Sequence, residues 1–448
     1  MNKNRLALLG VLSLGLAFPA HAQLGPGLTP FGAIQAASTD GAIPAYTGGL
    51  AAMSGLPTPT PATGYPDPFA GEKPIFSITS SNMAQYASML TPGTQALLRR
   101  YKDFRVDVYP THRTASYPAW VLQNIAKNNN GAVEVPNGDG VEGASYGGVP
   151  FPVPKDGYQV MWNNILAYQP AYCEEKSESY LVDSSGSVTD LGLLDTTWAE
   201  PYYDPSATSL PDNFFEYKLT RFITPAAEAG QLYLLKYPLD FTKSDDVTYF
   251  YSPGTRRVRL APEFKYDTPI ASYGGAIDWD EIGLFYGRLN KFDFKLIGEK
   301  EMIVPYNDFQ FSHTSADAIL GPHTLNPDDV RWERHRVWVV DATLKPTERH
   351  AYSRWTFYID EDTWKIVASE SYDHSNRIYR VGFLYPWFNY SQGDAMAVSP
   401  TFGVYDLSTG SYEISYVQTT DNGVWNCSAK LPDMSNFTPQ AIAAQAVR

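Results

Sequence analysis

The sequence predicts a β-dominated α+β protein in which a long irregular N-terminal arm precedes an antiparallel β domain. Two observations support this fold class. Aromatic residues make up 14% of the chain, with 31 Tyr, and Gly and Pro stand at 34 each, which is typical of strands joined by tight turns. In addition, short strand-like segments separated by polar turns follow one another from residue 172 onward.

The N-terminal residues predict export. Lys3 and Arg5 precede an apolar run over 6–18, which the small-residue pattern Ala-His-Ala follows at 20–22. This order is typical of a secretory signal peptide. We therefore expect residues 1–22 to be removed and the mature chain to be a soluble periplasmic protein, since no later stretch approaches the ~20 apolar residues of a transmembrane helix.

Composition divides the mature chain into three parts. Residues 23–149 contain stretches rich in Gly, Pro, Ala and Thr, which predict an extended arm with short helices. Residues 150–418 form the predicted main domain and residues 419–448 a C-terminal tail. Capping signals predict helices over 82–90, from Thr91-Pro92 to Tyr101, and over 157–168.

The main domain reads as a series of hairpins. The predicted strand pairs are 172–182 with 187–194, 214–222 with 231–237, and 246–251 with 256–260. Further strands are expected at 295–304, 334–344, 354–359, 364–371 and 377–384. Because the turns between neighbours are short, the strands are expected to form an antiparallel meander.

One face of two predicted strands is strongly apolar. The two-residue period places Trp355 and Phe357 on one face of their strand, and Trp338 and Val340 on one face of the preceding strand. The opposite face carries apolar residues as well, including Val339. Both faces of this sheet must therefore be covered in part.

Charge and cysteine content narrow the class further. The chain has 34 Lys and Arg against 48 Asp and Glu, a formal charge of -14, so its surface repels nucleic acid, which is not expected as a partner. Cys173 and Cys427 are the only cysteines. In an oxidising compartment they could form one long-range disulfide, and two buried free thiols are the alternative.

Two motifs could carry catalytic or metal chemistry, and each has a simpler interpretation. Gly-Ala-Ser-Tyr-Gly around Ser145 matches the G-x-S-x-G nucleophile pattern but lacks the required strand before it and helix after it, so a flexible loop is favoured. The acidic cluster Asp278-Trp279-Asp280-Glu281 could hold a cation or act as paired carboxylates, and a helix cap is favoured. The scattered histidines form no metal motif, and no cofactor is expected.

Several ordered motifs resemble the bacterial domain of unknown function 1329 family. They are LTPFGA at 28–33, DGAIPAYTGG at 40–49, YPTHR at 109–113, PFPVP at 150–154, SPGTRRVR at 252–259, VPYN at 304–307 and HRVWVV at 335–340. That family is similar to the outer-membrane lipoprotein-sorting proteins of the LolA/LolB type. The resemblance implies an open antiparallel β half-barrel with helices covering an apolar concave face, and the turns at 251–257 and 360–364 are similar to turns of that fold.

The resulting functional hypothesis is non-catalytic binding or shuttling of a hydrophobic, lipid-like ligand in the periplasm. The candidate cavity residues, which could instead be ordinary core, are Tyr249, Tyr251, Met302, Val304, Trp338, Val340, Trp355 and Phe357. One alternative is an adaptor that docks on an inner- or outer-membrane transport protein. The other is a hydrolase that uses Ser145 or the acidic cluster.

Overall fold

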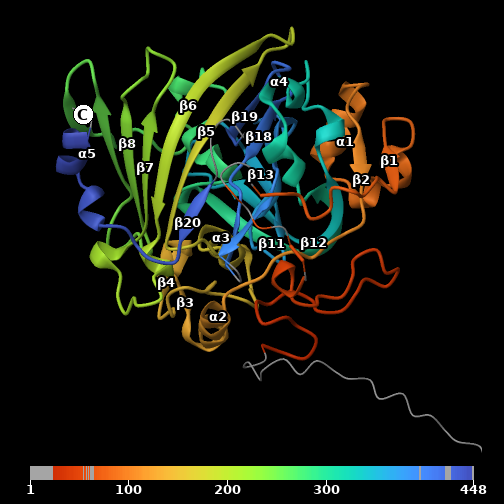
Figure 1. Cartoon of the computed structure of the whole chain (residues 1–448), viewed down its shortest axis with the longest axis horizontal. Coiled ribbons are helices and arrows are strands. Elements are labelled where there is room, and N and C mark those ends of the chain that lie inside the picture. Colours follow the sequence, from red (N-terminus) through yellow and green to blue (C-terminus); the bar gives the residue numbers. More distant parts are fainter. Residues whose placement is uncertain are drawn as a thin grey trace, which may run out of the picture.

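The computed structural model describes residues 24–53, 55–56, 58, 60, 65–392, 395–418 and 425–445. The expected signal peptide at 1–22 lies outside these residues, as does part of the expected tail. Within them, the chain forms a large open β-sheet with few helices, in agreement with the predicted fold class (Figure 1). Among the described residues, no helix is long and apolar enough to cross a membrane.

The main sheet consists of two consecutive meanders joined side by side. The first contains β5 (Tyr172–Val182), β6 (Val188–Ala199), β7 (Phe214–Phe222), β8 (Leu232–Pro238), β9 (Val247–Ser252) and β10 (Arg257–Leu260). The second contains β11 (Phe292–Pro305), β12 (Trp332–Leu344), β13 (Arg354–Asp360), β14 (Ile366–Tyr372), β15 (Ile378–Leu384), β18 (Phe402–Asp406) and β19 (Tyr412–Val417). β19 pairs with β5, so the last strand of the second meander lies beside the first strand of the first.

The connection between the two meanders crosses the sheet. β10 is the edge strand of the first meander, whereas β11 pairs with β12 at the other end. Residues 261–291, which we call the crossing segment, therefore span the sheet, and they contain the short 3₁₀ helices η7 (Ala271–Tyr273), η8 (Trp279–Leu284) and η9 (Leu289–Lys291). Its apolar side chains pack in the same cluster as one face of the sheet, which we call the inner face.

Helices and shorter strands pack on the faces and at the edges of the main sheet. The helices are α1 (Pro92–Arg100), α2 (Ala119–Gly131), α3 (Gly157–Ile165), α4 (Ala316–Ile319) and α5 (Pro439–Gln445). The remaining strands are β1 (Phe76–Ile78), β2 (Val106–Val108), β3 (Val133–Val135), β4 (Gly140–Glu142), β16 (Phe388–Gln392), β17 (Ala395–Val398) and β20 (Asn426–Ser428). α2 and α3 pack on the inner face, whereas α1 and α5 pack on the opposite, outer face.

A β-bulge in β11 changes which side chains face inward. The register between β11 and β12 shifts between Leu296 and Gly298. Before the bulge, Phe294 packs in the inner cluster, whereas after it Met302 and Val304 pack in the outer cluster with α1. The alternation of side chains reverses because a bulge inserts one extra residue into a two-residue period.

The predicted helices are found with one exception. α1 begins after Thr91, whose side chain accepts a hydrogen bond from the Thr94 amide, and α3 begins after the cap Asp156. Residues 82–90 instead form two short 3₁₀ turns, η2 (Met83–Gln85) and η3 (Ala87–Met89). Neither turn has a side-chain hydrogen bond at its cap, so nothing stabilises a longer helix there.

The N-terminal arm and the C-terminal tail both join the main sheet. β1 and β2 of the arm extend the sheet beside β12, and β20 of the tail pairs with β5. The arm is also fastened to the turn at 360–364, where the Trp364 indole donates to the Phe31 carbonyl at 3.0 Å and the Tyr117 hydroxyl donates to the Asp362 carbonyl at 2.6 Å. The arm is thus part of the folded body.

Candidate functional site: an internal cavity with buried charges

A cavity lies between the inner face of the first meander and its cover. Its volume is about 140 Å³. The sheet contributes Trp198, Phe215, Tyr237 and Tyr416; the end of α3 contributes Trp162, Ile165 and Leu166; the crossing segment contributes Ile282, Phe285 and Tyr286; and the tail contributes Trp425. The cavity therefore has largely aromatic walls supplied by the sheet, α3, the crossing segment and the tail.

The same cavity contains four charged side chains. Glu216 and Lys218 come from β7, Glu200 follows the end of β6, and Lys365 follows the turn between β13 and β14. Lys218 and Glu200 are each 5% exposed and Glu216 is 9% exposed. Buried charges are costly unless they are paired or solvated, so this arrangement is unusual for a purely structural interior.

Lys218 lies among aromatic rings rather than beside a carboxylate. Its ammonium donates a hydrogen bond to the Tyr416 hydroxyl at 2.5 Å and lies 4.8 Å from the centre of that ring and 5.4 Å from that of Trp198. Burial lowers the pKa of Lys218, and nearby Glu216 partly opposes this effect. Cation–π contacts replace part of the lost hydration.

The two glutamates form an acidic pair. Burial, together with the charge of Glu216 and a hydrogen bond to it, raises the pKa of Glu200 well above its ordinary value. Burial also raises the pKa of Glu216, while Lys218 opposes that shift. Two nearby carboxyl groups resist ionising together, so the pair holds protons more tightly than isolated glutamates do.

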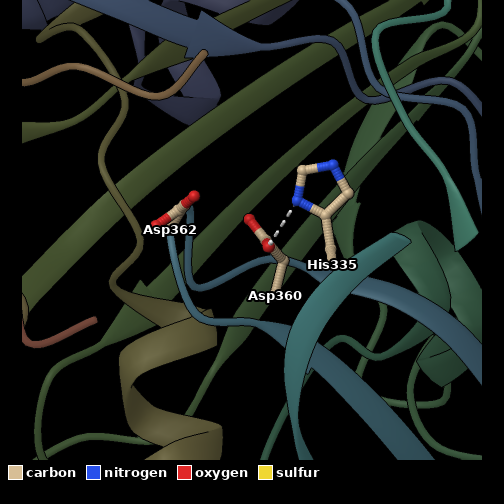
Figure 2. Close-up of side chains that lie close together, drawn as sticks. All are labelled: His335, Asp360 and Asp362. Atoms are coloured by element: carbon tan, nitrogen blue, oxygen red, sulfur yellow. Dashed lines mark ion pairs between the residues drawn. The ribbon is translucent and has the colours of Figure 1, made fainter. Parts of the chain in front are cut away.

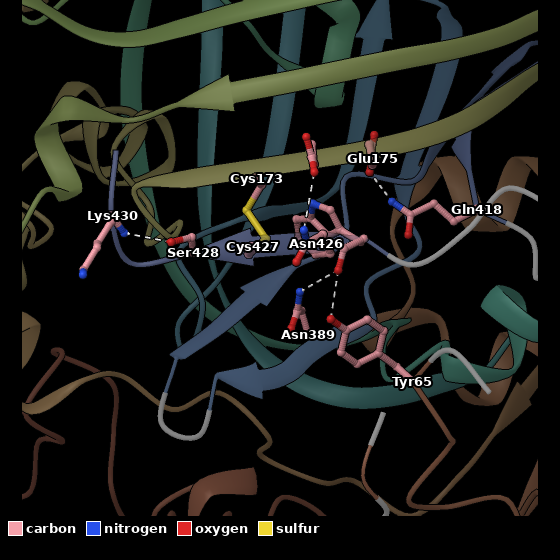
Figure 3. The surroundings of a disulfide bond; sticks show 11 residues. Tyr65, Cys173, Glu175, Asn389, Gln418, Asn426, Cys427, Ser428 and Lys430 are labelled. Carbon is pink, nitrogen blue, oxygen red and sulfur yellow. Dashed lines mark hydrogen bonds between the residues drawn. A yellow bond between two sulfur atoms is a disulfide. The ribbon is translucent and has the colours of Figure 1, made fainter. Parts of the chain in front are cut away.

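The tail closes one side of the cavity. Cys173 of β5 and Cys427 of β20 lie opposite each other and form a disulfide, which closes a sequence separation of 254 residues (Figure 3). Cys173 and Trp425 both line the cavity. The Tyr65 hydroxyl donates to the Trp425 carbonyl at 2.9 Å, so the arm holds the same segment from the other side.

The eight candidate cavity residues lie elsewhere in the core. Tyr249 and Tyr251 pack with α5, and Met302 and Val304 pack with α1, all on the outer face. Trp338, Val340, Trp355 and Phe357 do pack on the inner face, under the crossing segment. The described residues that line the cavity include none of these eight.

The closest of the eight lie one layer behind the cavity wall. Phe285, which lines the cavity, lies 5.8 Å from Trp355 and 5.5 Å from Phe357, measured between ring centres. Trp355 is 2% exposed and Phe357 is fully buried. The apolar face that the sequence indicated is thus filled by protein at this end of the sheet.

The two catalytic motifs occupy structural positions. Ser145 lies in a loop, where its amide donates to the Asn128 side chain at 2.6 Å. The next helix after it along the chain is α3, which begins only at Gly157. Asp278 caps η8 in a capping box with Glu281, which confirms the helix-cap interpretation. The Tyr352 hydroxyl donates to Glu281 at 2.5 Å, and Arg380 also pairs with Glu281.

His335, Asp360 and Asp362 form the cluster whose geometry most nearly suits a metal (Figure 2). Their ligand atoms all lie within 4.8 Å of one another, and all three residues are buried. The carboxylate of Asp362, however, is bound by Arg113 at 2.6 and 2.8 Å. Asp360 accepts hydrogen bonds from the Thr363 amide and hydroxyl at 2.9 and 2.7 Å. The Asp362 carboxylate and Oδ2 of Asp360 thus already have donors, whereas Oδ1 of Asp360 is buried without a hydrogen-bond partner among the described residues. Because Arg113 occupies Asp362, the cluster fits a charge network that fastens the arm better than a metal centre.

Sequence reasoning missed the charged cavity residues although one signal was present. β7 places Glu216 and Lys218 two residues apart among large apolar side chains, so both point to the same face. Charges at alternate positions of a buried strand indicate polar groups inside the protein. Lys365 gave no such signal, because it follows a turn whose last residue, Trp364, has a φ of 60°.

The fold and the cavity define an open-sheet protein with an internal aromatic chamber. A family described as a protein of unknown function, DUF1329, matches residues 77–443, and the chain belongs to this family. The uncharacterized protein PA3922 of Pseudomonas aeruginosa is 33% identical over 432 residues, covering 95% of this chain and 93% of that protein.

Similar solved structures share the chain's topology only loosely. A DUF1329 family protein of Desulfovibrio piger is 17% identical, with a TM-score of 0.42 over 64% of this chain and 97% of that one. A putative outer membrane lipoprotein-sorting protein domain of Vibrio parahaemolyticus is 12% identical, with a TM-score of 0.39 over 60% and 91%. A LolA superfamily protein of Nitrosomonas europaea is 11% identical, with a TM-score of 0.36 over 64% and 98%. Likenesses this weak carry no argument about a ligand.

Proposed function

We propose that this protein binds a hydrophobic, lipid-like ligand in the cavity and carries it within the cell envelope without transforming it. The observation that supports this proposal is the cavity of about 140 Å³ between the inner face and the crossing segment, walled largely by aromatic rings. Protein interiors are normally close-packed, so a void of this size favours an occupant.

The cavity volume limits what can enter it. A volume of about 140 Å³ is close to the ~150 Å³ of an engineered apolar cavity that holds benzene. It is smaller than the roughly 300–1,000 Å³ of pockets that enclose drug-sized ligands. In this conformation the cavity takes one ring or a short piece of acyl chain, and a larger ligand requires the crossing segment to move outward.

The driving force is the burial of apolar surface. Each Å² of ligand surface removed from water contributes roughly 25 cal/mol, so few polar contacts are needed for binding. Ligand exchange with a bilayer is then a transfer between two apolar environments. Ser145 and the Asp278 cluster, which would support a hydrolase, serve as loop and cap residues and add nothing to this cavity.

The test is to identify what the protein carries after gentle purification from its native envelope. Mass spectrometry of an organic extract is expected to show an apolar molecule at a stoichiometric level. Ile282→Trp fills the cavity from the crossing segment and should exclude that molecule. Ile297→Trp, at an exposed position of β11 outside the cavity, is the control and should not exclude it. An extract free of bound lipid, together with no uptake of added apolar ligand, would overturn the proposal.

The proposed location is the periplasm, and a transport protein of the inner or outer membrane is the proposed partner. The support is the charge and apolar pattern of residues 1–22, which predicts a signal peptide. Intact mass of the protein recovered from a periplasmic fraction should correspond to a chain that begins at Gln23. Recovery of the full-length chain from the cytoplasm would overturn this placement.

A further inference from the structure

Several hydrogen-bond donors that line the cavity are unused. The indole nitrogen of Trp425 and the hydroxyl of Tyr286 are buried there without a hydrogen-bond partner among the described residues. The Lys365 ammonium forms no hydrogen bond or ion pair with a described residue, and Lys218 uses one of its three donors on Tyr416. Oε1 of Glu216 is a buried acceptor that also lacks a partner among the described residues.

The charged side chains of the cavity also favour an anionic ligand. Lys218 and Lys365 contribute two ammonium groups to the lining, and burial raises the pKa of both Glu200 and Glu216, which favours their neutral forms. Burial lowers the pKa of both lysines, so each ammonium would gain from an added anion. An anionic group supplied by a ligand would pair with these ammonium groups and satisfy donors that otherwise need water.

The position of Lys218 also separates two apolar spaces. A second cavity of about 40 Å³ is lined by Phe222, Leu235 and Tyr273, and it shares Lys218, Tyr416 and Ile282 with the larger one. The hydrogen-bonded pair of Lys218 and Tyr416 thus lies at the boundary of the two spaces. An anionic group held there leaves apolar volume on both sides for the rest of the ligand.

We propose that the cavity selects an amphiphile with a single carboxylate headgroup, which Lys218 and Lys365 bind while the aromatic walls take the start of its chain. This inference rests on the proposed function and names the class of ligand. A charge-assisted hydrogen bond in a dry site is stronger than a neutral one. The neutral alcohol of the same chain length should therefore bind less tightly.

The chain offers a matched control lysine. Lys236 on β8 also lies over aromatic rings, 4.9 Å from the centre of Tyr217 and 5.9 Å from that of Phe214. Its side chain packs on the outer face, away from the cavity. Lys236→Met therefore removes a similar charge and similar ring contacts from the same hairpin without changing the proposed site.

The experiment is calorimetric titration of the disulfide-intact protein with decanoate, decanol and decylamine at neutral pH. We expect decanoate to bind about tenfold more tightly than decanol, which corresponds to about 1.4 kcal/mol. Lys218→Met and Lys365→Met should each remove this preference while decanol still binds, and Lys236→Met should leave it unchanged.

The outcomes separate the two proposals. Equal affinities for decanoate and decanol, or tightest binding of decylamine, would overturn the carboxylate inference and leave a cavity for neutral ligands. Failure of all three probes to bind would overturn the proposed function itself. The comparison of the three probes on the unaltered protein decides the question even if Lys218→Met does not fold.

Discussion

The inner face of the sheet is solid at one end and hollow at the other. Over β12 and β13, Trp355 and Phe357 are covered by Phe285 and Phe294, and the rings lie within 6.4 Å of one another, measured between ring centres. Over β6, β7 and β8, the same crossing segment leaves a cavity of about 140 Å³. The crossing segment takes part in the cover of both regions, and over the hollow region the end of α3 and the tail complete it.

The hollow region differs in charge rather than in aromatic content. Its strands present Glu216 and Lys218 inward, whereas the solid region presents rings and aliphatic side chains. Apolar side chains interdigitate until the space is filled, but charged groups resist burial against hydrocarbon. An aromatic face therefore predicts a covered sheet, and the charges of Glu216 and Lys218 within this face coincide with the place where the cover leaves a cavity.

The largest expected effect is a loss in the free energy of unfolding when one ring is truncated, and it should differ between the two regions. Phe357→Ala in the solid region should lower the free energy of unfolding by about 4 kcal/mol, because a filled core loses contacts and gains a void. Phe215→Ala on the cavity wall should cost about half as much, because one side of that ring already faces empty space. Urea denaturation of both variants measures the difference, and equal losses would mean that the hollow region is as tightly packed as the solid one.

Removal of the disulfide should act mainly on the hollow region. Replacing Cys173 and Cys427 with alanine should lower the free energy of unfolding by about 3 kcal/mol, since the bond closes a very long loop. Amide hydrogen exchange should rise in β5 and β20 next to the cavity and stay unchanged in β13. Uniform exchange along the chain would show that the bond stabilises the whole sheet instead.

A buried carboxyl group gives the hollow region its own pH dependence. Burial raises the pKa of Glu175 to about 8, so the folded state binds this proton more tightly than the unfolded chain does. Stability should therefore fall as pH rises from about 4.5 through about 8. Glu175→Gln, which keeps the shape and removes the titration, should flatten that fall in urea denaturation across this range. If the slope is unchanged in Glu175→Gln, the fall in stability with pH comes from other buried carboxyl groups.

The smallest expected effect comes from filling the cavity. Ile282→Trp should change the free energy of unfolding by about 1 kcal/mol or less, because added apolar contacts offset strain in the crossing segment. A loss of several kcal/mol would mean that the space is already occupied by side chains in solution. Thermal unfolding monitored by near-ultraviolet circular dichroism measures the change.

Most strand positions could be predicted because their signal is local. Alternating polarity and short turns located β5 to β9 and β12 to β15 within a few residues, and the cap sequence located α1. β16 to β19 were not predicted, although β18 and β19 carry the pairing that joins the meanders. Their place in the sheet depends on partners more than two hundred residues away, as in the pairing of Ile414 with Tyr180.

The candidate site could be predicted in kind but not in place. An apolar inner face was apparent from Trp355 and Phe357, yet the cavity lies over other strands. The bulge near Gly298 reversed the face of Met302, and periodicity alone could not show it. Tyr249 and Tyr251 belong to the outer face because the tail helix α5 covers them.

The sequence by itself determined the β-rich class, the hairpins and the family, since composition, two-residue periodicity and ordered motifs are all properties of short stretches. Only the tertiary structure decided where the sheet is filled and where it is hollow. That outcome depends on the crossing segment, α3 and the tail meeting over Lys218 and Glu216, and such long-range packing leaves no periodic trace in the chain.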